Sequence, residues 1–75
     1  MNWQDYIERN ADVMMGKPVL AGTRITVEFV LERLGQGATP EELVQNYVGL
    51  NTQHIRAAQA YAAMLLRHDE VVYQA

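Results

Sequence analysis

The side chains best suited to bind another molecule occur at two places in this chain. One place is the segment of residues 15–27, which contains Lys17 and Arg24. The planar guanidinium group of an arginine can bind a carboxylate or a phosphate through two parallel hydrogen bonds. Lys17 and Arg24 are therefore the candidate contacts to a partner protein or to a phosphate. Within the chain, Glu28 or Glu32 could bind Arg24 instead, and we expect Lys17 to be exposed.

The other place is the start of a predicted helix that follows Asn51. Its first turns carry side chains that can donate hydrogen bonds to base edges or to phosphates, which are Thr52, Gln53, Arg56 and Gln59. The same residue types also suit the solvent-exposed face of a helix that touches no DNA. We treat these four residues as candidate DNA contacts and keep the solvated face as the alternative. His54, at the same helix start, is expected to be exposed.

The sequence contains no pattern that is typical of catalysis or of metal binding. It has no cysteine, and its two histidines, His54 and His68, lack a third ligand at a suitable spacing. Glu41 and Glu42 are adjacent, so a helix would point them in different directions and not into one catalytic pair. The Gly-Lys pair of residues 16–17 lacks the spacing of a phosphate-binding loop. We expect a binding protein and not an enzyme, with no metal ion, cofactor or small-molecule substrate.

Length and charge narrow the class of protein further. A chain of 75 residues forms one domain with a small core, and without cysteine no disulfide stabilises it. Association with a second copy would bury additional surface, so we expect a homo-oligomer and favour a dimer. The net charge of −3 argues against a general nucleic-acid coat protein. Residues 51–68 nevertheless contain two arginines, two histidines and no acidic residue.

The hydropathy of the chain predicts its location. No apolar run reaches the ~18 residues that a membrane span needs. The amino terminus lacks the basic and then apolar character of a secretory signal. We therefore expect no membrane association and a cytoplasmic location.

Turn-forming and β-branched residues characterise residues 1–26. We expect a short strand around Tyr6–Glu8. We also expect a hairpin-like pair near Pro18–Leu20 and Thr23–Thr26 that turns at Ala21-Gly22. Residues of this segment with an expected structural role in its backbone are Gly16, Pro18, Gly22 and Thr23.

Strand alternation in the second half of this pair would sort its side chains onto two sides. Ile25 and Val27 would lie on one side, and Arg24 and Thr26 on the other. A hairpin of two strands is marginal in water, so it must pack on helices or pair with another chain, and we expect it to help build the assembly.

Residues 27–68 have the apolar spacing of three helices. Thr26 is the expected N-cap of the first helix, and Gly35 or Gly37 ends it. Its apolar stripe consists of Val27, Val30, Leu31 and Leu34.

Two further helices follow. Residues 39–42, Thr-Pro-Glu-Glu, form a capping box with proline at the first helical position, and the helix runs to about Tyr47. Asn51 caps the third helix, after a short linker that contains Gly49. This arrangement is typical of a helix-turn-helix. The sequence leaves open the structure of the tail, residues 69–75. The expected fold over residues 1–75 is one α+β domain, mostly α.

Three segments of the chain resemble the family known as domain of unknown function 433. They are GKPVLAGTRITV at residues 16–27, GATPEE at residues 37–42 and LNTQHI at residues 50–55. The resemblance extends from about Tyr6 to Leu66, nearly the whole chain. The sequence departs from the family pattern at His54, where an acidic residue is usual.

The resemblance implies both a fold and a function. It implies a short β segment followed by a homeodomain-like three-helix bundle. Members of this family are small prokaryotic proteins regarded as VapB-like antitoxins, often encoded beside a PIN-like ribonuclease toxin. We therefore expect an antitoxin that restrains the product of the neighbouring gene by direct contact and whose helical half binds operator DNA. A stand-alone helix-turn-helix regulator and a structural adaptor that binds no DNA remain as alternatives.

Overall fold

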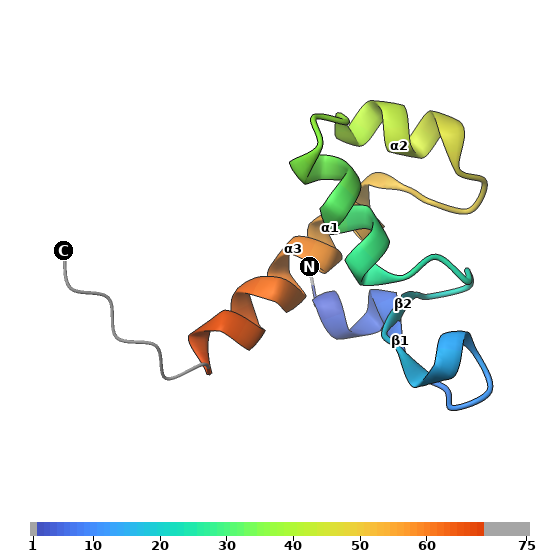
Figure 1. The fold of residues 1–75 in the computed structure, drawn as a ribbon, viewed down its shortest axis with the longest axis vertical. Helices are drawn as coiled ribbons and strands as arrows, with labels where there is room; N and C mark the ends of the chain where they lie inside the picture. The colour runs from blue at the N-terminus through green and yellow to red at the C-terminus, as the bar shows by residue number, and fades with distance from the viewer. Residues whose placement is uncertain (1, 69–75) are drawn as a thin grey trace, which may run out of the picture.

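Helices make up most of the computed structural model, which describes residues 2–68 (Figure 1). Its elements in chain order are the 3-10 helix η1 (Trp3–Tyr6), strand β1 (Ile7–Glu8), the 3-10 helix η2 (Met14–Gly16), strand β2 (Val19–Leu20) and the α-helices α1 (Val27–Gly35), α2 (Pro40–Asn46) and α3 (Thr52–Arg67). The α+β, mostly α fold that the sequence predicts is confirmed. The tail at residues 69–75 lies outside the described residues.

The small sheet pairs β1 with β2 in antiparallel register, with Ile7 opposite Leu20 and Glu8 opposite Val19. The expected hairpin-like pair within residues 18–26 is therefore correct only in part. The chain does reverse after Leu20, whose N–H donates to the carbonyl of Ile25 at 2.9 Å. The second limb contributes only an isolated bridge between Val19 and Thr26, and not a strand.

The predicted alternation of side chains in this limb is wrong at Thr26. Thr26 is only 8% exposed, although the expected strand would place it on the same side as Arg24, which is exposed. The reason is that its hydroxyl accepts a hydrogen bond from the N–H of Phe29 at 3.0 Å and caps α1. The first backbone N–H groups of a helix need hydrogen-bond acceptors. This need, and not strand alternation, determines the position of the Thr26 side chain.

The three α-helices begin where the sequence predicts. Thr26 caps α1, and α1 ends at Gly35. Thr39 and Glu42 form the expected reciprocal capping box, with proline at the first position of α2. Asn51 caps α3 by accepting a hydrogen bond from the N–H of His54 at 2.9 Å. Local side-chain chemistry is thus sufficient to define all three starts.

One apolar cluster holds the domain together. It contains residues from β2, all three helices and the linker before α3: Leu20, Val27, Val30, Leu43, Leu50, Ile55 and Ala58. The helix η1 packs across α3, with the rings of Trp3 and Tyr61 at a centroid distance of 5.3 Å. Among residues 2–68, none of the helices has the length and hydropathy needed to span a membrane.

The capping box of α2 makes stability depend on pH. Hydrogen bonds from Thr39, above all from its backbone N–H, lower the pKa of Glu42. Folding thus makes Glu42 harder to protonate. Its contribution to stability is complete above the pKa of the unfolded chain and is lost as the pH falls through the lower pKa of the folded chain.

We therefore expect the wild-type protein to lose more stability than Glu42→Gln as the pH falls from about 6 to about 3. The amide of glutamine keeps a hydrogen-bond acceptor for Thr39 but does not titrate in this range. Urea unfolding at a series of pH values measures the difference, and parallel curves for the two proteins would contradict it.

Candidate functional site

A network of short hydrogen bonds fixes the turn that precedes Arg24. The hydroxyl of Thr23 donates to the carbonyl of Leu20 at 2.8 Å and accepts from the N–H of Ile25 at 3.0 Å. Gly22 adopts φ +80°, and its N–H donates to Oε1 of Glu8 at 2.9 Å. The structure therefore places Gly22 at a positive φ and both Gly22 and Thr23 in the hydrogen bonds of this turn.

His54 connects this turn to the start of α3. Its Nδ1 accepts a hydrogen bond from the N–H of Asn51 at 3.1 Å, and its Nε2 lies 3.0 Å from the carbonyl oxygen of Ala21. Because Nδ1 is an acceptor, the ring proton resides on Nε2, which donates to Ala21. The ring of Tyr6 meets the imidazole edge-on at a centroid distance of 5.9 Å.

The prediction that His54 is exposed is wrong, since the residue is only 6% exposed. The third position of a helix is where a capping-box side chain returns to the N-cap backbone, and here the imidazole does what a glutamate or glutamine usually does. The spacing Asn-x-x-His could have revealed the capping role. The bond to Ala21 spans 33 residues, and nothing local predicts it.

The linker between α2 and α3 packs against the same turn. Gly49 adopts φ +96°, and a Cβ added there would lie 3.3 Å from the side chain of Thr23. The turn of residues 21–24 and the first turn of α3 therefore form one continuous unit.

The candidate DNA contacts share the exposed face of α3. The structure places all of them in solvent on the first two turns of the helix and just beyond: Thr52, Gln53, Arg56 and Gln59. On the opposite face, Ile55 and Ala58 enter the core. A recognition helix needs this division, and so does any amphipathic surface helix.

The two candidate partner contacts differ in their surroundings. Nζ of Lys17 forms an ion pair with Oε1 of Glu28 at 3.2 Å, with the two side chains 50% and 60% exposed. Arg24 is exposed, and its side chain forms no hydrogen bond or ion pair within residues 2–68. The alternative in which Glu28 or Glu32 binds Arg24 is therefore absent from the structure, and no other side chain within residues 2–68 binds its guanidinium.

The remaining motif residues, Gly16 and Pro18, lie in the segment that leads into β2. Gly16 adopts φ +79°, and its carbonyl accepts a hydrogen bond from Nε of Arg9 at 3.1 Å. The carbonyl of Pro18 accepts from the N–H of Val27 at 3.0 Å. Met14 and Met15 precede Gly16 with φ of 48° and 56°, a backbone conformation that is strained for residues other than glycine. The positive φ of Gly16 is the conformation for which a glycine was expected at this position, and the stiffening role of Pro18 stays a prediction.

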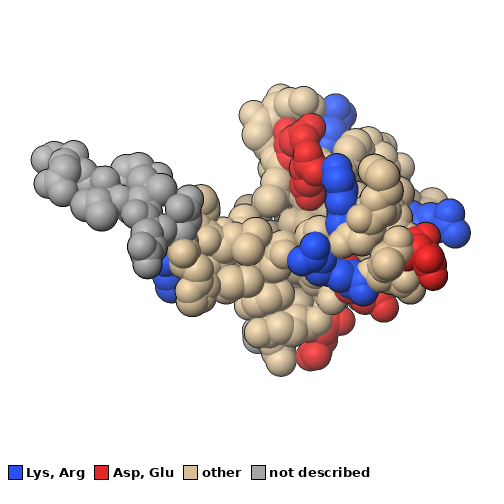
Figure 2. Space-filling model, turned by 60° about the horizontal axis from the view of Figure 1, so that its bottom comes forward, with Lys and Arg blue, Asp and Glu red and all other residues tan. Residues whose placement is uncertain are grey.

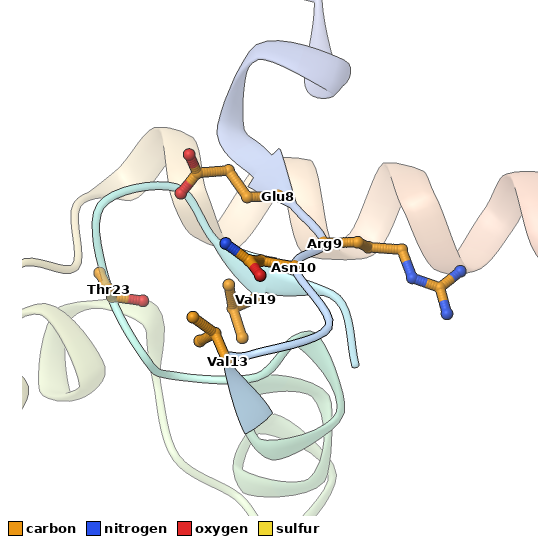
Figure 3. Close-up of a pocket in the computed structure, with 6 residues that line it drawn as sticks. All are labelled: Glu8, Arg9, Asn10, Val13, Val19 and Thr23. Carbon is orange, nitrogen blue, oxygen red and sulfur yellow. The ribbon is translucent and has the colours of Figure 1, made fainter. Parts of the chain in front are cut away.

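Charged side chains of both signs are interspersed on the surface in view in Figure 2. An open hollow of about 330 Å³ lies beside the turn, lined by Glu8, Arg9, Asn10, Val13, Val19 and Thr23 (Figure 3). Arg9 points away from the other five in that view, so the hollow does not gather groups for acid–base chemistry. Within residues 2–68, no three His, Cys, Asp or Glu side chains could together hold a metal ion.

Comparison with known proteins identifies the family of the chain. The family model described as "Protein of unknown function (DUF433)" matches residues 7–62, and the chain therefore belongs to this family. The resemblance inferred from the three sequence segments is confirmed. No curated protein matches the chain.

The fold is also similar to a solved structure, the crystal structure of a DUF433 member protein from Anabaena variabilis ATCC 29413. The TM-score is 0.77 and the sequence identity is 31%. The alignment covers 85% of this chain and 63% of that one, so the chain spans less than two thirds of its structural neighbour.

Removing the imidazole of His54 should destabilise the domain. We expect His54→Ala to lower the free energy of unfolding by about 2 kcal/mol, because Ala21 loses a hydrogen-bond donor and Asn51 an acceptor. His54→Gln should lose less, since glutamine at this position maintains the capping box. Urea unfolding followed by circular dichroism measures both changes.

The exposed neighbour Gln53 provides the matched control. We expect Gln53→Ala to change the free energy of unfolding by no more than about 0.5 kcal/mol. A loss in His54→Ala as small as that in Gln53→Ala would contradict a supporting role for the imidazole.

Proposed function

We propose that this protein is a binding protein and not an enzyme, and that it acts as the antitoxin of a two-gene toxin–antitoxin pair. In this proposal it binds the protein encoded by the neighbouring gene, a PIN-like ribonuclease, and restrains it by direct contact. The VapB-like antitoxins that the family resemblance implied are the source of this hypothesis.

The observation that carries the proposal is that Arg24 is exposed and unpaired within residues 2–68. The turn beneath it is fixed by hydrogen bonds of Gly22 and Thr23 to Glu8, Leu20 and Ile25. The guanidinium at the end of this rigid turn has no partner within residues 2–68. An arginine presented in this way loses little backbone entropy when it binds, and arginine is enriched among the residues that dominate protein interfaces.

The test is co-expression of the chain with the product of its neighbouring gene, scored by growth and by a complex that survives gel filtration. We expect the wild-type chain to restore growth and to form the complex. Arg24→Ala should raise the dissociation constant by about tenfold or more, because a central interface arginine commonly contributes over 1 kcal/mol.

Arg33→Ala is the matched control, since Arg33 is an exposed arginine of α1 whose side chain, within residues 2–68, bonds only its near neighbour Gln36, at 3.0 Å. Its complex should have the wild-type affinity. If the wild-type chain neither restores growth nor binds the neighbouring protein, the antitoxin proposal is wrong. Binding that is equally strong in Arg24→Ala would remove Arg24 from the interface.

A second function, operator DNA binding, is favoured by the exposed polar face of α3. The helix-turn-helix of α2 and α3 would insert this face into the major groove, where Gln53 and Gln59 could contact base edges and Arg56 a guanine or a phosphate. In this proposal the same protein represses its own operon. A stand-alone regulator would show this activity without a toxin, and a structural adaptor would lack it.

We expect Arg56→Ala to weaken binding to the DNA upstream of the gene by about 10-fold to 100-fold, the usual effect of losing a specific arginine contact. If Arg56 contacts a phosphate, the salt dependence of binding should also become shallower by about one phosphate contact. Fluorescence anisotropy over a salt series measures both, with Arg33→Ala as control. Unchanged affinity in Arg56→Ala would exclude this face as the DNA contact.

A further inference from the structure

One exposed apolar side chain, that of Met14, lines the same hollow as Arg24. Met14 is 46% exposed, Met15 is 88% exposed and Val48 is 99% exposed. Met14 itself lines a hollow of about 290 Å³, and Val48 directly follows Tyr47, which lines the same hollow. Isolated exposed apolar residues are common on soluble proteins, but an apolar hollow that also presents an exposed charged residue is typical of an interaction surface.

The floor of this hollow is well supported. Ile25 and Tyr47 both line it and pack against the apolar core. The rings of Phe29 and Tyr47 meet edge-to-face, with a centroid distance of 5.2 Å and an interplanar angle of 80°. The hollow therefore combines two packed aromatic rings with the exposed side chain of Met14, and a methionine side chain adapts its shape to what it contacts.

Charge distinguishes this hollow from the other apolar hollow of similar size. The hollow beside Met14 has Arg24 as the charged residue of its lining. The hollow between α1 and α3 is bordered by two carboxylates, those of Glu28 and Glu32. A ligand that carries a carboxylate next to an apolar group is therefore complementary to the first hollow and disfavoured at the second, where Glu32 adds a negative charge beside the Glu28–Lys17 ion pair.

We propose that the hollow formed by Met14, Ile25, Phe29, Tyr47 and Arg24 receives a segment of a partner protein that carries a carboxylate beside an apolar side chain. The guanidinium of Arg24 binds the carboxylate, and the apolar side chain lies on the rings of Phe29 and Tyr47. Arginine and aromatic residues are the types that contribute most to protein–protein binding. This inference rests on the proposed binding of a partner protein and specifies the chemistry of the segment that is bound.

The test uses two synthetic peptides and the full-length chain labelled with nitrogen-15. The probes are acetyl-Phe-Glu-Leu amide and its glutamine analogue, which has nearly the same shape but no charge. We expect the glutamate peptide to shift the amide resonances of residues around the hollow and to bind roughly tenfold more tightly than the analogue, because charge-assisted bonds to arginine are the stronger ones. Arg24→Ala should abolish this preference, and Arg24→Lys should retain part of it.

Equal affinity for the two peptides, no binding of either peptide, or shifts confined to the α1–α3 hollow would overturn the inference. The peptide experiment does not involve the neighbouring gene. Arg24-dependent peptide binding together with no complex in co-expression would therefore refute the antitoxin proposal but leave this surface assigned. A toxin complex that depends on Arg24, combined with peptides that bind equally, would refute the surface chemistry and leave the antitoxin proposal intact.

Discussion

The pair of hydrogen bonds made by His54 connects the two halves of the domain. One bond completes the cap of α3 through Asn51, and the other holds the carbonyl of Ala21 in the turn before Arg24. The chain has no disulfide and a core of few residues, so the position of the turn relative to α3 depends on such polar contacts. A buried imidazole with both nitrogens satisfied costs little to bury and would cost much to replace by an apolar residue.

Two features of the molecule depend on the Gly-Thr-Arg sequence of residues 22–24. The first two residues fix a turn, and the third exposes a charge at the end of it. Gly22 donates a hydrogen bond to Glu8, and the hydroxyl of Thr23 forms hydrogen bonds with Leu20 and Ile25. These bonds fix the turn. Arg24 follows immediately and makes no such bond within residues 2–68. The hydrogen bonds of the first two residues therefore determine where the third presents its charge, and in the proposed function a single short motif serves both the fold and the contact with a partner.

The sequence was informative wherever a structure depends on nearby residues. The caps at Thr26, Thr39 and Asn51 act over three residues, and all three helix starts were predictable. The bonds of Gly22 to Glu8 and of His54 to Ala21 span 14 and 33 residues, so no local pattern reveals them. The predicted second limb of the hairpin does not form a strand, for a related reason. Strand alternation would expose the Thr26 side chain, but this side chain caps α1 instead. The charge of Arg24 was predictable, but the pairing of Glu28 with Lys17 and the absence of a partner for Arg24 within residues 2–68 depend on the tertiary structure.

The balance of charge favours protein binding as the primary role over DNA binding. The net charge of the chain is −3, and of the four candidate DNA contacts on α3 only Arg56 is charged. Because affinity for DNA depends largely on how many phosphates are neutralised, one copy of this helix would bind weakly at physiological salt. Binding at two half-sites by a dimer would double the contacts, so operator recognition would require self-association. A protein partner needs no such assembly, since one arginine on a rigid turn beside an apolar hollow is already a suitable binding centre.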